Sequence, residues 1–280
     1  FTGPDLHLIT DAVKIANKYL NPFFFVIVMI IAILVLIAMI ILFVKGPRYR
    51  GKLRYRVNIP FVLIVVLAFA GTTRLALDKR VLSNYFGNIA FAYQDYGYPY
   101  CLATTIFNTG ISCPRDYSES AINEIEDSES NLPKTGEKRP NIIFLQLESF
   151  FDPTEVEWLQ FSEDPIPNLR KMFQNYSSGY FKAPSVGAGT ANTEFEVLTG
   201  MSMRFFGPGE YPYKTYAKTK YVESAASALS ALGYGTEALH NNGGNFYSRA
   251  QVYNHMGFDH YTSKEFMNIL QTTPNGWATD

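Results

Sequence analysis

A carboxylate and a hydroxyl mark the stretch between residues 141 and 200. An apolar run at 142–147 stops at Glu148, as a buried parallel strand does at an active-site edge. About forty residues later a loop of small residues leads to Thr190, which begins a segment with helical spacing. An acid at a strand end and a hydroxyl at a helix start can share one divalent cation. The cation would lower the hydroxyl pKa and make Thr190 a nucleophile toward phosphorus or sulfur.

A plainer interpretation of the same residues stays open on spacing alone. Glu148 would then be a surface acid at a strand end, and Thr190 an ordinary helix N-cap. The same choice arises at His240 and Arg249. These two suit a phosphate, held bidentately by Arg and by one donor of His, but they also suit a core histidine and a surface arginine.

The amino-acid sequences of four segments favour the chemical interpretation. In order and spacing they resemble the lipoteichoic acid synthase family of phosphoglycerol transferases, which belongs to the alkaline phosphatase and sulfatase superfamily. The resemblance covers Pro140 to the end of the chain. The four segments are NIIFLQLESF (141–150), PIPNLRKM (165–172), GAGTANTEFEVLTG (187–200) and LHNNGGNFYSR (239–249).

This resemblance implies an enzyme and its site. Glu148 and Thr190 would be protein ligands of a catalytic Mn²⁺ or Mg²⁺. Thr190 would attack the phosphorus of phosphatidylglycerol, expel diacylglycerol and form a phosphoglyceryl-threonine intermediate. A growing glycerol phosphate polymer would then accept the phosphoglycerol unit. His240, Tyr247 and Arg249 match positions that hold the phosphoglycerol group, although a family member carries Trp in place of Tyr247.

The resemblance also implies further metal ligands, an adjacent Asp-His pair on a much later strand. The pair Asp259-His260 matches a structural stretch of the family instead, so we do not assign it to the metal. We expect the ligand pair beyond Asp280, in a protein of which this chain is a piece truncated at both ends and inactive by itself. Three nearby acids are predicted to be surface or helix-start charges: Asp152, Glu194 and Glu196.

The first 80 residues are predicted to be a membrane segment. Residues 23–44 are uncharged and span roughly 33 Å as a helix, enough to cross a bilayer. A second, weaker span is expected at 57–77. The loop between them carries six Lys and Arg residues, so the positive-inside rule puts it in the cytoplasm and everything after the second span outside. An amphipathic helix from Pro4 would lie at a membrane surface or in a soluble part.

Three regions follow the membrane segment. Residues 81–114 are rich in Tyr and Phe, as in an interfacial belt, although these rings could instead pack in a soluble core. A disulfide between Cys101 and Cys113 is left open. Residues 115–138 are a polar linker with a short helix, and 139–280 are part of the catalytic domain.

The order of elements in the last region predicts an α/β fold. Strands and helices alternate, which is typical of a mainly parallel sheet covered by helices. Ligands gather at the carboxyl ends of such strands, where Glu148 and His240 are both expected. Strands are predicted at 142–147, 179–183 and 236–240, and helices at 168–176, from 190, at 222–232 and at 247–256.

The net charge of −1 gives no basic excess, so nucleic-acid binding is not expected. The leading interpretation is a phosphoglycerol transferase in a bacterial cell membrane, multi-pass, with its catalytic domain outside. The alternatives are another enzyme of the superfamily, such as a phosphoethanolamine transferase or a sulfatase-like hydrolase, and a non-catalytic membrane-anchored relative.

Overall fold

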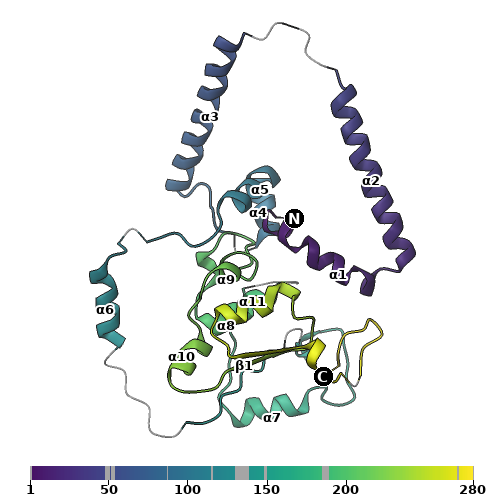
Figure 1. Cartoon of the computed structure of the whole chain (residues 1–280), viewed down its shortest axis with the longest axis vertical. Helices are drawn as coiled ribbons and strands as arrows, with labels where there is room; N and C mark the ends of the chain where they lie inside the picture. The colour runs from purple at the N-terminus through teal and green to yellow at the C-terminus, as the bar shows by residue number, and fades with distance from the viewer. Residues whose placement is uncertain are drawn as a thin grey trace. The chain divides into compact units, whose positions relative to one another are not determined.

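The structure is a computed structural model that combines helices with a small parallel sheet (Figure 1), and this agrees with the predicted α/β class. It describes residues 2–47, 51, 54–86, 88–114, 116–129, 139–147, 150–184, 189–269 and 271–279. The chain divides into two compact units. One contains Phe1–Ile111 and Arg204–Asp280, and the other is Ser112–Met203.

Two long apolar helices lie where the two spans are predicted. Helices α2 (Pro22–Lys45) and α3 (Tyr55–Asp78) have 24 residues each, about 36 Å, and no part of their apolar windows is buried. The Asn21 side chain accepts a hydrogen bond from the Phe23 amide at 3.0 Å and so caps α2. By length and composition both helices are candidate membrane spans.

Short helices lie before and after these spans. The predicted amphipathic helix is present as η1 (Pro4–Leu8) and α1 (Ile9–Tyr19). The aromatic region forms α4 (Ile89–Tyr96) and α5 (Tyr98–Phe107), and α5 meets the N-terminus where the Thr105 hydroxyl accepts a hydrogen bond from the Gly3 amide at 2.9 Å. Some of the rings pack on one another, and the ring centroids of Phe86 and Tyr96 are 6.0 Å apart. Others remain exposed, as Phe91 does at 64%.

Neither cysteine is in a disulfide. Cys101 is fully buried on α5, where its thiol lies 3.2 Å from the Ala92 carbonyl oxygen. Burial raises the pKa of this thiol, with the Asp95 charge adding to the shift. Cys113 is exposed. Cys101 is therefore a small packing residue of the α4–α5 pair.

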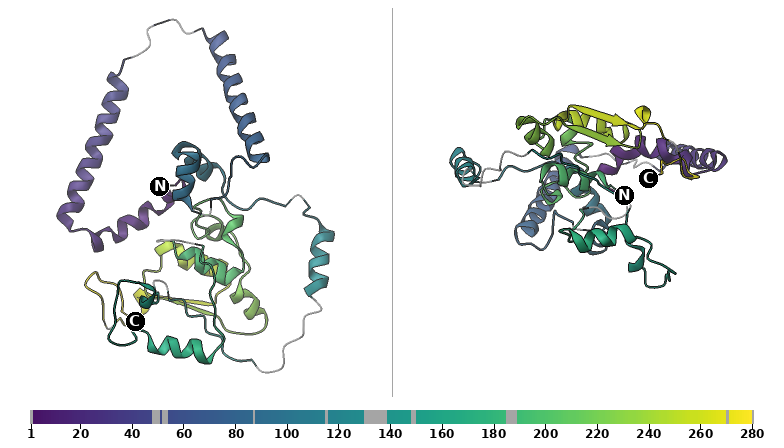
Figure 2. Two further views of the ribbon diagram at one scale, coloured as in Figure 1. Left: turned by 180° about the vertical axis from the view of Figure 1, so that it is seen from behind. Right: turned by 90° about the horizontal axis from the view of Figure 1, so that it is seen from below.

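The best-developed part of the fold is a β-α-β unit. Strand β1 (Glu237–His240) pairs in parallel with β2 (His260–Ser263), and His240 lies opposite Ser263. Helix α11 (Arg249–His255) connects them and lies beside the two strands (Figure 2). The fully buried Val252 and Met256 face the core. The predictions of a strand at 236–240 and a helix at 247–256 are thus confirmed.

Helix α10 (Ala225–Ala231) leads into this unit. Ser224 begins it with a capping box, and the Ser224 hydroxyl also donates to the Met256 carbonyl oxygen at 2.6 Å. Both Thr236 groups, the amide and the hydroxyl, donate to Oδ2 of Asp259 at 2.8 and 3.0 Å. Side chains therefore fix the start of β1 to the start of β2.

The remaining elements are short. The other unit contains α6 (Glu119–Glu129), η2 (Pro153–Glu155), α7 (Pro167–Asn175) and α8 (Ala191–Thr199). These confirm the helices predicted in the linker, at 168–176 and from 190. The rest are η3 (Met203–Phe205), α9 (Tyr216–Thr219), η4 (Phe246–Ser248) and η5 (Lys264–Phe266).

Two predicted strands are wrong. Residues 142–147 and 179–183 belong to no strand, and their apolar side chains are exposed, Ile143 to 87% and Phe181 to 70%. A strand requires a neighbour for its backbone hydrogen bonds, and in the described part of the chain no segment pairs with either stretch. An apolar run alone therefore did not determine the conformation.

Candidate functional site

The predicted nucleophile begins helix α8. Thr190 is half-buried, and its carbonyl oxygen accepts the first helical hydrogen bond, from Glu194 at 3.1 Å. Its side chain makes no capping bond to the helix. Ala191 and Phe195 are fully buried and fix the helix, which ends at Gly200 in the left-handed conformation (φ 70°). The hydroxyl thus lies at a helix N-terminus, where a negative charge is favoured.

The predicted acid, Glu148, lies outside the described residues, and so do residues 185–188 of the loop before Thr190. Among the described residues, no three His, Cys, Asp or Glu side chains form a group that could hold a metal ion. Carboxylate and hydroxyl oxygens are suitable donors for Mg²⁺ or Mn²⁺, so Glu148 and Thr190 fit a divalent cation in kind. Two protein ligands are fewer than such a site uses.

His240 ends β1 at the carboxyl edge of the sheet, as predicted. The amide of Asn242 donates to its Nδ1 atom at 3.1 Å. With Nδ1 acting as an acceptor, a neutral imidazole carries its proton on Nε2. In that tautomer Nε2 is the donor atom of the ring.

The glycine loop after His240 is held by Glu265. Both carboxylate oxygens of Glu265 accept from the Gly244 amide at 3.1 Å, and one also accepts from the Ser263 hydroxyl at 2.5 Å. The hydrogen bond from Ser263 is the largest cause that holds the pKa of Glu265 below its usual value. A side chain at 244 would lie 3.0 Å from the Ser263 hydroxyl oxygen, so the close packing favours glycine.

Two consecutive residues with unusual backbone conformation precede α11. Tyr247 (φ 55°) and Ser248 (φ 61°) are both in the left-handed region, which is costly for residues with a side chain. Such strain persists only where surrounding contacts fix it, and it is common at functional sites.

Aromatic and cationic groups surround the ring of Tyr247. Tyr211 stacks on it with centroids 6.1 Å apart, and the Lys214 amino group lies 5.8 Å from its centre. Burial, with the nearby Tyr247 as the second cause, raises the pKa of Tyr211 to about 12. Arg249, 1% exposed, lies with its guanidinium carbon 5.4 Å from the same ring centre. The surface arginine of the plainer interpretation is therefore wrong.

The structure brings Tyr247 and Arg249 into contact, and one loop joins them to His240. Thr190 belongs to the other compact unit. The Asp259 carboxylate accepts a hydrogen bond from the Thr236 amide, a structural contact. Its pKa is lowered, chiefly by the hydrogen bond from the Thr236 amide.

The three other acids near the motif have mixed outcomes. Asp152 caps η2 through the Thr154 amide at 2.9 Å and pairs with Arg170 at 3.2 Å, so it is a helix-start charge as predicted. Glu194 is in the first turn of α8, so it is a helix-start charge as predicted, although it is buried, 8% exposed. Glu196 is half-buried and accepts from the Met203 amide at 2.5 Å.

Tyr211 and Lys214 are two residues of this group that the sequence alone does not predict. Their signal is the interleaving of aromatic and basic residues at 211–220, which places a hydrophobic ring and a cation on one short segment. Without knowing that this segment packs on Tyr247, the pattern does not indicate a partner.

Comparison with known proteins adds a family. The sulfatase family model matches residues 140–277. This region is similar to the sulfatase family. Such a domain indicates an enzyme of the phosphotransferase or hydrolase kind, and members of the sulfatase family typically depend on a divalent cation.

Two individual proteins are similar to the chain. A protein of Rhizobium meliloti (strain 1021), provisionally named a cyclic beta-1,2-glucan modification protein, is 32% identical over 179 residues, or 64% of this chain. The chain spans only 27% of the length of that relative. The crystal structure of the lipoteichoic acid synthase LtaP from Listeria monocytogenes matches 35% of this chain and 22% of its own, with 24% identity and a TM-score of 0.30.

Proposed function

We propose that the sulfatase-family domain belongs to a membrane-anchored phosphoglycerol transferase with Thr190 as its nucleophile. The observation that carries the proposal is the position of Thr190 at the N-terminus of α8. Ala191 and Phe195, both fully buried, hold the start of this helix in place. The helix dipole favours the charge of the attacking oxygen and of a phosphoryl group beside it.

The reaction has two displacements at phosphorus. The Thr190 oxygen attacks the phosphorus of phosphatidylglycerol, and the bond from phosphorus to the diacylglycerol oxygen breaks. That oxygen takes a proton and leaves. An acceptor hydroxyl then attacks the phosphothreonine, and Thr190 recovers its proton. A divalent cation, Mn²⁺ or Mg²⁺, would be held by Glu148 and Thr190 with further ligands, and when bound it lowers the pKa of the hydroxyl.

The second group of residues would bind the phosphoglycerol unit. His240 offers its Nε2 proton as a donor, because its Nδ1 atom already accepts from Asn242. Tyr247 supplies a ring surface for the glycerol carbons. Arg249 supplies positive charge beneath that ring, so it acts on phosphate through the local field and through its contact with Tyr247.

The acceptor would be a glycerol phosphate polymer of the lipoteichoic acid type. The candidate spans α2 and α3 would place the protein in a bacterial cell membrane as a multi-pass protein with the catalytic domain outside. A lipid donor is then present at the base of the domain.

A glucan hydroxyl is the second candidate acceptor. The observation that favours it is the similarity to the Rhizobium meliloti protein named for modification of cyclic beta-1,2-glucan. The nucleophile and the first displacement would be unchanged, so only the second step distinguishes the two candidates.

The test uses the whole protein in vesicles that contain phosphatidylglycerol labelled in its headgroup glycerol. We expect Mn²⁺-dependent release of diacylglycerol and a phosphoglyceryl group on Thr190, detected by mass spectrometry. Thr190→Ala should abolish both signals, whereas Thr193→Ala, on the same helix, should retain them. Labelled product on a glycerol phosphate polymer or on cyclic glucan identifies the acceptor. Unchanged diacylglycerol release by Thr190→Ala would remove Thr190 from the mechanism.

A further inference from the structure

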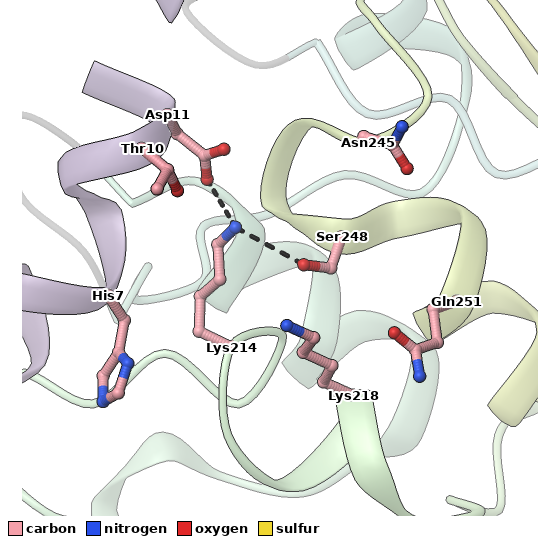
Figure 3. Close-up of a pocket in the computed structure, with 8 residues that line it drawn as sticks. All are labelled: His7, Thr10, Asp11, Lys214, Lys218, Asn245, Ser248 and Gln251. Atoms are coloured by element: carbon pink, nitrogen blue, oxygen red, sulfur yellow. Dashed lines mark hydrogen bonds and ion pairs between the residues drawn. The ribbon is translucent and has the colours of Figure 1, made fainter. Parts of the chain in front are cut away.

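A polar pocket of about 330 Å³ lies between the N-terminal helices and the segment that precedes and begins α11 (Figure 3). This volume is near the lower end of small-molecule sites, roughly 300–1,000 Å³. None of the lining residues is apolar. They are His7, Thr10 and Asp11 from η1 and α1, Lys214 just before α9, Lys218 within α9, and Asn245, Ser248 and Gln251 around the start of α11. The pocket shares no residue with the set proposed for catalysis.

Positive charge exceeds negative charge in this pocket. The Lys214 amino group pairs with Asp11 at 2.5 Å, and both side chains are buried, 8% and 5% exposed. The same amino group lies 3.4 Å from the Ser248 hydroxyl oxygen (Figure 3). Lys218 is half-buried and takes part in no ion pair within the part of the chain that the structure describes. Its ammonium group can therefore bind an anionic ligand.

The neutral side chains suit a ligand with hydroxyl groups as well as charge. Asn245 and Gln251 each offer amide donors and an acceptor, and Thr10 and Ser248 offer hydroxyls. A cation is disfavoured, because the only carboxylate in the lining is already paired with Lys214. A neutral sugar would leave the half-buried ammonium group of Lys218 without a counter-charge.

We infer that this pocket is a binding site for a small organic phosphate that carries hydroxyl groups, with Lys218 as its principal cation. Lysine binds phosphate as a compact charge, and Lys214 is the second cation. The polar side chains on the α11 side would hold the hydroxyl-bearing carbons. Glycerol phosphate is the simplest compound of this class.

The ligand could be soluble or part of a lipid headgroup. Only Leu20 and Asn21 separate α1, which forms one wall, from the candidate span α2. A lipid headgroup would therefore present the same phosphate group to the pocket.

The test measures the labelling rate of lysines in the pocket itself, so binding at the proposed active site does not affect the result. The whole protein in detergent micelles is labelled briefly with an amine acetylating reagent, with and without glycerol 1-phosphate, and each lysine is read by mass spectrometry. We expect millimolar glycerol 1-phosphate to slow labelling of Lys218 at least threefold. Lys220, exposed and stacked on Tyr216, is the matched internal control and should label at an unchanged rate. Equal labelling of Lys218 with and without the phosphate would overturn the site, as would equal protection by glycerol.

Substitutions that remove a negative or a positive charge from the pocket should change its phosphate affinity in opposite directions. Asp11→Asn removes the negative charge and leaves Lys214 with a polar neighbour, so the concentration that half-protects Lys218 should fall severalfold. If Asp11→Asn instead weakens protection while the protein stays folded, the pocket does not select anions. In a separate binding titration, Lys218→Gln should reduce phosphate affinity about tenfold and Lys220→Gln should not.

Two further arms identify the source and separate this inference from the proposed reaction. Protection by phosphatidylglycerol nanodiscs, but not by phosphatidylcholine nanodiscs, assigns a lipid headgroup. Protection by the soluble phosphate alone assigns a soluble ligand. Thr190→Ala should keep the protection of Lys218 although it lacks transfer activity.

Discussion

The guanidinium carbon of Arg249 lies 5.4 Å from the centre of the Tyr247 ring, and both residues are buried. The two are separated by Ser248 alone, and the left-handed conformation at 247 and 248 turns the ring back over the arginine. The strained backbone and the cation–ring contact are therefore parts of one arrangement.

This relationship predicts how position 247 responds to substitution. Tyr247→Leu should lower the free energy of unfolding by about 2 kcal/mol, because it removes ring area and the cation–ring attraction. Tyr247→Trp and Tyr247→Phe should change it by less than about 1 kcal/mol, since both keep an aromatic face over Arg249. Denaturation followed by circular dichroism measures the difference. Tyr221→Leu, at an exposed tyrosine, is the control and should stay within about 0.5 kcal/mol.

Glu210 is a second buried charge with a structural role. Its carboxylate, 1% exposed, accepts from the amides of Gly110 and Gly207 at 2.7 and 3.0 Å and from the Thr215 hydroxyl at 2.6 Å. Glu210→Ala should therefore cost about 3–5 kcal/mol, because one buried and two partly buried donors lose their acceptor. Glu210→Gln should cost less, since one acceptor oxygen remains.

The midpoint of thermal unfolding, measured on the protein in detergent micelles, tests this prediction. Glu223→Ala, at an exposed glutamate, is the matched control and should leave the midpoint nearly unchanged. Equal midpoints for Glu210→Ala and Glu223→Ala would contradict the assigned role of the three hydrogen bonds.

Tyr211 predicts a loss of stability at high pH. Burial raises its pKa to about 12, above the ordinary value of 10.0, so the folded state keeps the phenol proton after the unfolded chain has lost it. Its contribution is complete below pH 10 and is lost as the pH rises toward 12. The free energy of unfolding should therefore fall more steeply between pH 10 and 12 in the wild type than in Tyr211→Phe. Parallel curves for the two proteins would exclude this cause.

Two glycines should respond oppositely to alanine. Gly257 has φ +82°, and an added Cβ would lie 2.9 Å from Cβ of Ser227, so Gly257→Ala should cost more than about 1 kcal/mol. Gly235 has open space around its Cα and no positive φ, so Gly235→Ala should be neutral or slightly stabilising. Urea titrations of both variants test the contrast, and a neutral Gly257→Ala would show that the turn after α11 can adopt another conformation.

Local patterns predicted the elements that depend on local physics. The 22 uncharged residues at 23–44 predicted α2, because a helix satisfies the backbone hydrogen bonds of so apolar a segment within the segment itself. Small residues before Thr190 and helical spacing after it predicted α8 with Thr190 as its first flanking residue. His240 was correctly expected at a strand end, since a short apolar strand followed by a glycine loop has few alternatives.

Features that depend on distant partners could not be read from the sequence. The pair of Lys214 and Asp11 joins positions far apart in the chain, and neither residue carries a local signal of the other. The apolar run at 142–147 has strand composition but no pairing segment among the described residues. Arginine is seldom fully buried, so the sequence leaves a surface position open for Arg249, and its contact with the Tyr247 ring is a distant-partner feature of this kind.

The β-α-β unit has a consequence for the order of folding. Thr236 and Asp259, which bond the start of β1 to the start of β2, are only 23 residues apart, whereas Gly110 and Glu210 are separated by 100. A short loop closes with less loss of chain entropy, so β1, α11 and β2 should assemble before the segment around Glu210 joins the residues that follow α5. Substitutions inside the β-α-β unit should therefore slow refolding, and those at Glu210 should mainly accelerate unfolding.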